Sequence, residues 1–170
     1  QHLLKRLSLT FGPESGGEFS SQKTVAVREI VDNATDEVMA GFGDRVRVQF
    51  FDDGSVTVQD SGRGIPVDKS RDASGREVSG IVKCLGIIQS GGKFGSGASY
   101  SAGLNGVGAS STIHCSKRAD VTVFRGGKRY SVSFADGVPG FFDKRGEFTE
   151  LSDYSRLRVS KDSRGVEERR

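Results

Sequence analysis

The hydrophobic positions of residues 24–41 repeat with the period of an α-helix. The apolar side chains that define this repeat are Ala26, Ile30, Val31, Ala34 and Val38. Their spacing places them on one face of a helix. Ser20 or Ser21 can cap the beginning of this helix, and Gly41 can close its end. The segment is therefore predicted to be an amphipathic helix that packs on a core.

The polar residues of the same segment form a second face. Glu29, Asn33, Asp36 and Glu37 stand at i, i+4, i+7 and i+8, so they are neighbours on the helix surface. An ordinary solvated face is the usual explanation for such a stripe. Because no Lys or Arg stands four residues further on to offset the acids, a metal ion or a basic loop could compensate their charge instead.

After Gly41 the hydrophobic period changes from helical to alternating. Residues 44–51 and 55–60 alternate, and an Asp-Gly turn signal separates them, which predicts a β-hairpin that ends at Asp60. The glycine-rich stretch SGRGIP follows. Asp60 either caps this turn or presents its carboxylate to an amino group in a pocket, with Ile65 and Pro66 as an apolar wall. The pattern alone leaves both interpretations open.

In the rest of the chain, segments with helical spacing come first and segments with strand alternation follow them. Residues 76–89 have helical spacing despite two glycines, and residues 109–116 form a plausible shorter helix. Strands are predicted over 119–125, 129–136 and 154–160, with a break over 137–140. This segregation favours an α+β two-layer sandwich, in which a helix layer covers a mostly antiparallel sheet.

The segment 90–108 shows little periodicity and is rich in glycine. Lys93 is its only charged residue. A stretch of this length without structure usually acts as a functional lid. Gly103, Gly106 and Gly108 precede the helix expected at 109–116, where free N–H groups favour an anion such as phosphate. The pattern lacks the Gly-Lys-Ser/Thr ending of a P-loop.

Composition adds few further constraints. The chain has 170 residues, a mass of 18.2 kDa and a net charge of +3, with the basic residues spread along its length. These values predict one soluble cytoplasmic domain without a membrane span, in which nucleic-acid contact is only weakly indicated. The cysteines, Cys84 and Cys115, and the histidines, His2 and His114, have no metal-ligand spacing. Both thiols are expected to be reduced and buried.

Four segments carry a resemblance to a known family. In chain order they are REIVDNATDEVMAG, VQDSGRGIPVD, GGKFG and GLNGVGAS. They resemble the successive ATP-site motifs of the gyrase B and topoisomerase IV B subunits. These subunits belong to the superfamily of gyrase, heat-shock-90, histidine-kinase and mismatch-repair ATPases. The resemblance covers residues 24–160. It implies a Bergerat-type fold with a helix layer on a mixed, mostly antiparallel sheet, and an ATP- and Mg²⁺-dependent activity that drives DNA strand passage.

The resemblance also implies roles for individual residues. Glu29 resembles the general base that activates the attacking water, and Asn33 resembles the Mg²⁺ ligand that bridges the phosphates. Asp60 resembles the carboxylate that binds adenine, assisted through water by the hydroxyl of Ser155. Arg125 matches an arginine outside the pocket that aminocoumarin inhibitors contact. The cofactor-binding residues implied are Asn33, Ala34, Asp36, Glu37, Asp60, Arg63, Gly64, Ile65, Pro66, Lys93, Gly103, Leu104, Asn105, Gly106, Val107, Gly108 and Ser155.

Within this set, several residues act as groups in the family. Glu37 and Arg63 resemble an ion pair, and Gly64 to Pro66 resemble the adenine wall. Lys93 and the stretch Gly103–Gly108 would wrap the triphosphate as an ATP lid. The family usually has His where Asn105 stands, and Asn resembles phage and eukaryotic type II enzymes. The family's PGMYIG segment is not visible in the stretch LTFGPESGGEF.

The resemblance further predicts how the chain is organised. Residues 1–170 are expected to form a single ATP-binding domain with an N-terminal segment at 1–22 and a lid at 90–108, without transducer or cleavage domains. Such a fragment should be monomeric, bind ATP and aminocoumarins, and hydrolyse ATP weakly if at all. Its parent would act with a topoisomerase A subunit on DNA, in the cytoplasm at the nucleoid. The alternatives are a mismatch-repair or chaperone type of ATPase, or a nucleotide-binding gating module without hydrolysis.

Overall fold

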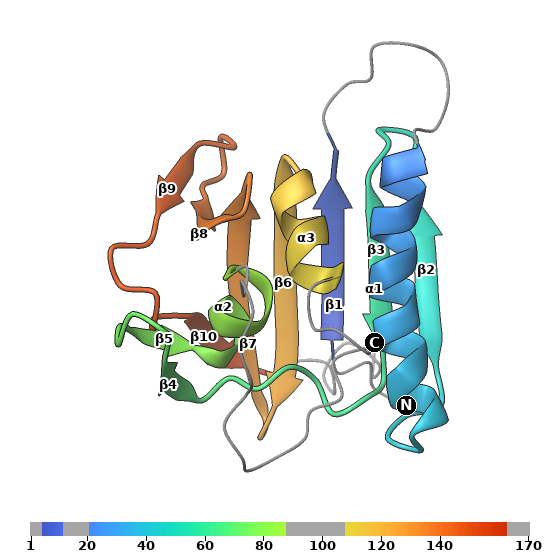
Figure 1. Cartoon of the computed structure of the whole chain (residues 1–170), viewed down its shortest axis with the longest axis horizontal. Helices are drawn as coiled ribbons and strands as arrows, with labels where there is room; N and C mark the ends of the chain where they lie inside the picture. The colour runs from blue at the N-terminus through green and yellow to red at the C-terminus, as the bar shows by residue number, and fades with distance from the viewer. Residues whose placement is uncertain (1–4, 12–20, 88–107, 163–170) are drawn as a thin grey trace.

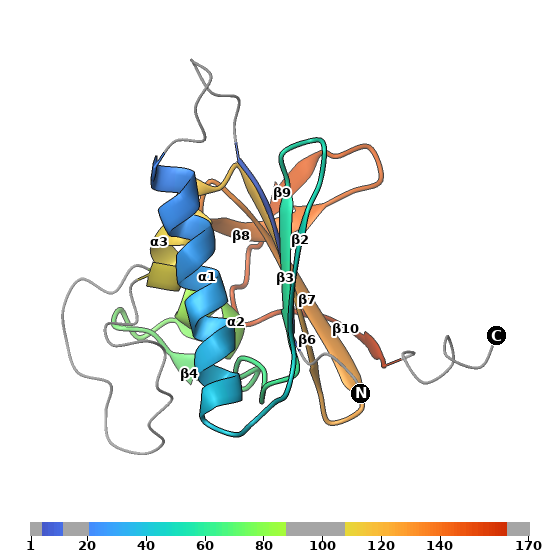
Figure 2. The ribbon, with the colours of Figure 1, turned by 90° about the vertical axis from the view of Figure 1, so that its right-hand side faces the viewer.

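Helices cover one face of a large sheet in this protein. The computed structural model describes residues 5–11, 21–87 and 108–162. Its helices are α1 (Ser21–Met39), α2 (Gly80–Leu85) and α3 (Gly108–Cys115). They lie on the same side of the sheet, which is clearest when the molecule is seen edge-on (Figures 1 and 2). The predicted helix layer on a mostly antiparallel sheet is therefore confirmed.

The main sheet has eight strands. Their order is β2-β3-β1-β6-β7-β8-β9. On the edge of β7 that faces away from β6, β8 pairs with residues 133–135 and β10 pairs with residues 128–131. The strands are β1 (Lys5–Thr10), β2 (Val46–Phe50), β3 (Val56–Asp60), β6 (Arg118–Arg125), β7 (Lys128–Ala135), β8 (Val138–Phe142), β9 (Phe148–Glu150) and β10 (Arg158–Lys161). A separate hairpin consists of β4 (Lys69–Arg71) and β5 (Glu77–Ser79). All pairings among the described strands are antiparallel.

Strand β1 lies in the middle of this sheet, although the sequence analysis predicted no strand there. It pairs with β3 on one side and with β6 on the other. Leu7 and Leu9 point to the core and are 2% and 0% exposed. Their alternation with Ser8 and Thr10 was the available signal. The register places Lys5 directly opposite Asp60, the last residue of β3.

The core fills the space between the helices and the sheet. Helix α1 contributes the apolar face predicted for it, because Ala26, Ile30 and Ala34 are buried. The cluster joins residues of α1, α2, α3 and the central strands: Leu7, Leu9, Val27, Ile30, Ala34, Val56, Val58, Ile81, Val82, Leu85, Ile113, Ala119, Val121, Val123, Val132 and Phe134. Burial of this apolar surface fixes the height of α1 and α3 above the strands.

Gly41 ends helix α1 as predicted. Its φ is +81°, a value that glycine adopts at little cost. The Gly41 N–H donates to the carbonyl of Val38 (2.9 Å), and the Phe42 N–H donates to that of Glu37 (3.0 Å). This Schellman arrangement satisfies the last carbonyls of the helix and turns the chain toward β2.

Three sequence predictions about elements are wrong at least in part. The strand expected over 154–160 begins at Arg158, after a turn at residues 154–155. The helix expected over 76–89 begins later, because β5 occupies its start and Ser79 caps α2 by accepting from the Val82 N–H (3.3 Å). Short apolar runs do not distinguish a buried strand from a helix. The break expected over 137–140 is a tight turn at Asp136 and Gly137, both with positive φ, that leads directly into β8.

The cysteines are free, but they are not both buried. Cys84 is half-buried in α2, whereas Cys115 is exposed at the last residue of α3. Burial raises the pKa of the Cys84 thiol. The expectation of two buried thiols is therefore wrong for Cys115, which follows the last core residue of its helix, Ile113.

No helix in the described part of the chain is both long and apolar enough to cross a membrane.

Candidate functional site

The polar stripe of α1 is not a uniform solvated face. Glu29, Asn33 and Glu37 are half-buried, while Asp36 is exposed. Ala34 is fully buried and belongs to the core cluster. The Asn33 side chain makes no hydrogen bond with another described residue. The stripe therefore includes three polar side chains that the fold partly covers.

Glu29 lies against the beginning of α3. A Cβ added at Gly108 would collide with the Glu29 carboxylate, so only glycine fits there without a shift. The two helices are joined nearby, because the buried Thr112 hydroxyl is 3.0 Å from the Ala26 carbonyl oxygen and 2.9 Å from that of Gly108. The Glu29 carboxylate therefore lies at a helix N-terminus, where the helix dipole favours negative charge.

Glu37 and Arg63 form an ion pair between α1 and the turn that follows β3. Arg63 Nη2 donates to Glu37 Oε1 (2.7 Å), and Arg63 Nε and its backbone N–H both donate to Oε2 (3.1 and 3.0 Å). These bonds hold the pKa of the Glu37 carboxyl below its ordinary value. The Arg63 guanidinium also stacks on the Phe42 ring, 3.6 Å from its centroid. For Glu37, a basic loop supplies the compensating charge.

Asp60 is buried at the end of β3 and is 1% exposed. Its Oδ1 accepts from the Gly62 N–H (2.9 Å), so it caps the turn, as one of the two sequence interpretations expected. Its Oδ2 lies 2.9 Å from Lys5 Nζ but has no hydrogen bond of acceptable geometry with the described residues. The second interpretation, in which the carboxylate accepts from an amino group in a pocket, is therefore compatible with the accepting capacity that Oδ2 retains.

Gly62 lies between the two carboxylates. A Cβ at this position would be 2.7 Å from Glu37 Cβ, 2.9 Å from Glu37 Oε2 and 3.0 Å from Asp60 Oδ1. Real Cβ atoms essentially never show the two Glu37 distances, and the Asp60 distance is tighter than most Cβ contacts. The glycine therefore allows Glu37 and Asp60 to share one side of the turn.

The three residues after Arg63 continue into an apolar segment. Gly64 is buried with a φ of +75°, and Ile65 and Pro66 are half-buried, with Ile65 packed against the core. The Pro66 carbonyl lies so close to Gly80 that a Cβ at Gly80 would overlap it. The expected wall residues thus lie between the Asp60 turn and the beginning of α2.

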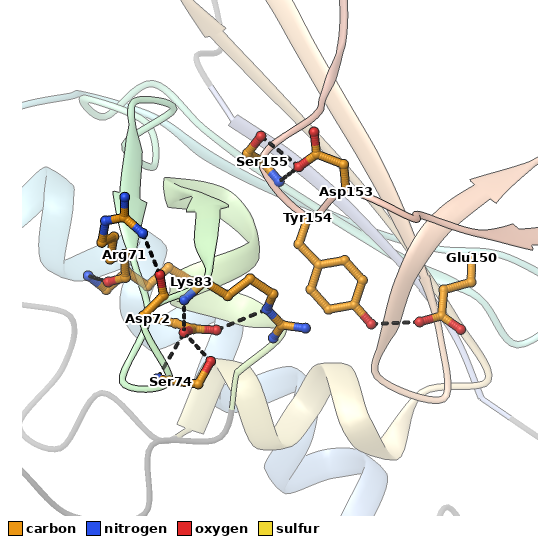
Figure 3. Close-up of polar contacts among 10 residues, drawn as sticks. Arg71, Asp72, Ser74, Lys83, Glu150, Asp153, Tyr154 and Ser155 are labelled. Carbon is orange, nitrogen blue, oxygen red and sulfur yellow. Dashed lines mark hydrogen bonds and ion pairs between the residues drawn. The ribbon is translucent and has the colours of Figure 1, made fainter.

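Ser155 is buried in a segment that contacts this same region. Its hydroxyl donates to Asp153 Oδ1 (2.7 Å), which holds the Asp153 pKa below its ordinary value (Figure 3). The Ser79 N–H donates to the carbonyl of Tyr154 (3.0 Å) and so ties the segment to the cap of α2. The structure thus brings Ser155 to the α2 side of the site, with its hydroxyl bonded to Asp153 and not to Asp60.

The β4–β5 hairpin is anchored to α2 beside this segment. Lys83 Nζ donates to the Arg71 carbonyl (3.0 Å), and Asp72 accepts from the Ser74 hydroxyl (2.6 Å), as Figure 3 shows. The Tyr154 hydroxyl donates to Glu150 Oε1 (2.7 Å). These contacts position the backbone around Ser155 and α2.

The remaining expected site residues are Arg125 and six residues of the segment 90–107. Arg125 is exposed at the end of β6, directly opposite Lys128. Lys93, Gly103, Leu104, Asn105, Gly106 and Val107 lie outside the described residues. The sequence analysis did not identify Lys5 as a site residue. It stands two residues before Leu7, so in a strand its side chain lies on the same inward face, where a charged residue is unusual.

The sequence also matches a known protein family. Residues 22–138 match the family described as histidine kinase-, DNA gyrase B-, and HSP90-like ATPase. The chain belongs to this family. It is 44% identical over 150 residues to the topoisomerase protein TopoN of Mycolicibacterium smegmatis, covering 85% of this chain and 21% of that protein. It is 41% identical over 139 residues to the DNA gyrase B protein of Chlamydia muridarum, covering 75% and 17% of the two chains.

Solved members of the ATPase family share the fold. The 43K ATPase domain of Thermus thermophilus gyrase B, in complex with an aminocoumarin, matches with a TM-score of 0.56 and 33% identity over 82% of this chain and 30% of that one. The topoisomerase IV ATP-binding domain of Francisella tularensis, in complex with a small-molecule inhibitor, matches with a TM-score of 0.54 and 29% identity, covering 80% and 34%.

These matches favour one branch of the ATPase family. The relatives named are gyrase B and topoisomerase IV B proteins and the topoisomerase protein TopoN, so a mismatch-repair or chaperone type is not favoured. The chain is an ATPase domain of the gyrase B and topoisomerase IV B type. It spans about a fifth of the length of the curated relatives it matches.

Proposed function

We propose that this ATPase domain binds ATP between α1, the turn after β3 and the beginning of α3. The observation that carries the proposal is the buried Asp60 carboxylate, whose Oδ2 is in ion-pair contact with Lys5 but makes no well-aligned hydrogen bond with the described residues. A buried acceptor of this kind is costly unless a donor reaches it. The exocyclic amine of adenine is such a donor.

The surroundings of Asp60 fit a purine. Ile65 and Pro66 are half-buried in the turn that follows Asp60 and would provide apolar surface for the purine, as small-molecule sites commonly do. We propose that the Ser155 hydroxyl assists the purine contact through a water molecule. The Glu37–Arg63 ion pair would then keep the turn, and with it Asp60, in place.

The phosphates would lie toward α3. Its N-terminus offers free N–H groups and a favourable dipole, and Glu29 lies at this end of the helix. We propose that Glu29 accepts the proton of the water that attacks the γ-phosphate. Lys93 and residues 103–108 would close over the triphosphate as a lid.

Asn33 fits the role of a Mg²⁺ ligand. Mg²⁺ prefers oxygen ligands and is commonly held by one or two protein groups together with phosphates and water. The Asn33 amide is half-buried on the same helix face as Glu29, one turn further along. When bound, Mg²⁺ would offset the negative charge of the phosphates.

The wider function follows from the relatives. We propose that the parent protein is a type II DNA topoisomerase of the gyrase B kind, which couples ATP hydrolysis to strand passage together with DNA and an A-type partner, in the cytoplasm at the nucleoid. Because a gyrase B relative was solved with an aminocoumarin, we also propose that this class of inhibitor binds here and contacts Arg125.

Calorimetric titration tests the ATP site. The wild-type chain should bind a non-hydrolysable ATP analogue, and Asp60→Asn should reduce the affinity by at least about tenfold, since the amide presents a donor as well as an acceptor. The matched control is Asp120→Asn, at a half-buried strand carboxylate that bonds to Ser133 and Arg118 instead. Equal affinity of wild type and Asp60→Asn would contradict the proposal.

A competition assay tests the inhibitor contact. Novobiocin should displace the analogue, and Arg125→Ala should weaken novobiocin while leaving ATP affinity unchanged. Arg129→Ala is the control. Arg129 is also an exposed arginine, but it follows Lys128, the strand partner of Arg125. Its side chain therefore points to the opposite face of the sheet from that of Arg125. Equal effects of the two substitutions would rule out a specific contact by Arg125.

A further inference from the structure

Lys5 is a buried lysine that the ATP-site roles described above do not use. It is 8% exposed, and buried lysines are rare unless they are paired. Its Nζ lies 2.9 Å from Asp60 Oδ2. The antiparallel register places Lys5 directly opposite Asp60, on the same face of the sheet as Leu7 and Leu9. The lysine therefore approaches Asp60 from the core side of the site.

The two oxygens of Asp60 are held from different directions. The Gly62 N–H donates to Oδ1, while Lys5 contacts Oδ2 without a well-aligned hydrogen bond. Oδ2 therefore keeps accepting capacity, because a carboxylate oxygen has two lone pairs.

The charge of Lys5 also reaches the neighbouring ion pair. The pKa of Glu37 is lowered chiefly by the hydrogen bonds from Arg63 and, more weakly, by the charge of Lys5. Two carboxylates, Glu37 and Asp60, thus share one side of the turn with two cations. Removal of Lys5 would leave the buried Asp60 carboxylate without a cation in contact, which is strongly unfavourable.

We propose that Lys5 is a positioning residue for nucleotide recognition, which balances the charge of Asp60 and orients Oδ2 to accept the exocyclic amine of adenine. This inference rests on the proposed function, because it requires adenine at Asp60. Lys5 acts through Asp60 and contacts no phosphate. Its contribution is therefore specific to ligands that carry the amine.

Binding of two ligands separates this role from a merely structural one. The ligands are ATP and the purine riboside triphosphate that has hydrogen in place of the 6-amino group. Lys5→Met should weaken ATP binding about tenfold and leave the affinity for the 6-hydrogen analogue within about twofold of wild type. Lys5→Arg, which keeps the charge, should restore the preference for ATP. The matched control is Arg6→Met, next along β1 but exposed on the opposite face of the sheet.

The outcomes are distinguishable. Equal losses for both ligands would show that Lys5 has only a structural role, and tighter ATP binding by Lys5→Met would show that Lys5 competes with the amine; either result overturns the inference. If Asp60→Asn keeps the ATP preference of the wild type, or the wild type shows none, the proposed adenine contact itself fails and the inference falls with it. If Asp60→Asn loses the preference and Lys5→Met keeps it, only the inference about Lys5 is overturned.

A measurement on the wild type covers the case in which Lys5→Met does not fold. The ¹⁵Nζ resonance of Lys5, assigned by its absence in Lys5→Arg, should shift when ATP is added and shift much less with the 6-hydrogen analogue. Equal shifts with the two ligands, or no shift with ATP, would contradict the inference.

Discussion

The Glu37–Arg63 ion pair gives the most quantitative prediction, because its geometry is bidentate and it links α1 to the turn that carries Asp60. The two side chains are 16% and 32% exposed, so the pair lies between a surface and a buried ion pair. Exposed pairs contribute about 0–1 kcal/mol, whereas removing one partner of a buried pair costs about 3–5 kcal/mol. For Glu37→Ala, Arg63→Ala and the double variant, we expect a coupling free energy of about 1–3 kcal/mol.

Chemical denaturation of these variants measures the coupling through a double-mutant cycle. Each single substitution should also lower Tm by about 2–4 °C for every kcal/mol lost, as expected for a domain of this size. The control is Lys69–Glu77, an ion pair with a similar distance (3.1 Å) whose side chains are 58% and 53% exposed. Its coupling should be below about 1 kcal/mol. A Glu37–Arg63 coupling no larger than this control would refute the reasoning.

The same ion pair predicts a pH dependence. Because the folded-state pKa of Glu37 is lowered from about 4.5, its stabilising contribution is fully present above the unfolded pKa. It is lost as the pH falls through the folded pKa. The coupling measured at pH 7 should therefore shrink as the pH is lowered progressively below about 4.5. A coupling that stays constant through this range would contradict the assigned cause of the shift.

Three further predictions concern packing and reactivity. Thr112→Val should lower the free energy of unfolding by about 1–2 kcal/mol, because it removes a buried hydrogen bond between α3 and α1. Thr35→Val is the control, because it removes an exposed hydrogen bond within α1. In the same denaturation assay it should lower the free energy of unfolding by less than about 0.5 kcal/mol. Gly62→Ala should weaken binding of the ATP analogue and lower Tm, since its Cβ would overlap the Glu37 side chain and press on the Asp60 carboxylate. Unchanged binding and Tm would contradict the close packing of this turn. In the native protein, mass spectrometry should find Cys115 alkylated before Cys84, whose burial raises its thiol pKa; faster labelling of Cys84 would show that α2 opens readily.

The fold was predictable where one periodic pattern extended over a whole element. Helix α1 was identified from its apolar face and from Gly41, and the β2–β3 hairpin from alternation around an Asp-Gly turn. Short elements were not predictable in this way. The apolar residues of β5 and α2 together have helical spacing, so one helix was predicted over both elements. β1 was missed because its two inward leucines are too few to establish an alternating period.

The site shows the same division. The residue types of the α1 stripe and of the SGRGIP turn suggested a charge-compensated pocket, and the structure shows Arg63 on Glu37. The contact between Lys5 and Asp60 depends on strand order, because β1 and β3 are separated by the whole of α1 and β2 along the chain. Local patterns contain no information about such a pairing. The roles of Glu29, Asn33 and Ser155 remain predictions.

Hydrogen–deuterium exchange with and without a non-hydrolysable ATP analogue tests the central claim most directly. The account predicts slower exchange in the turn from Asp60 to Pro66 and at the beginning of α3, where the purine and the phosphates would bind. Exchange in β8 and β9, at the opposite edge of the main sheet from β3, should not change. Unchanged exchange at both predicted segments under saturating analogue, or protection confined to β8 and β9, would contradict an ATP site at Asp60.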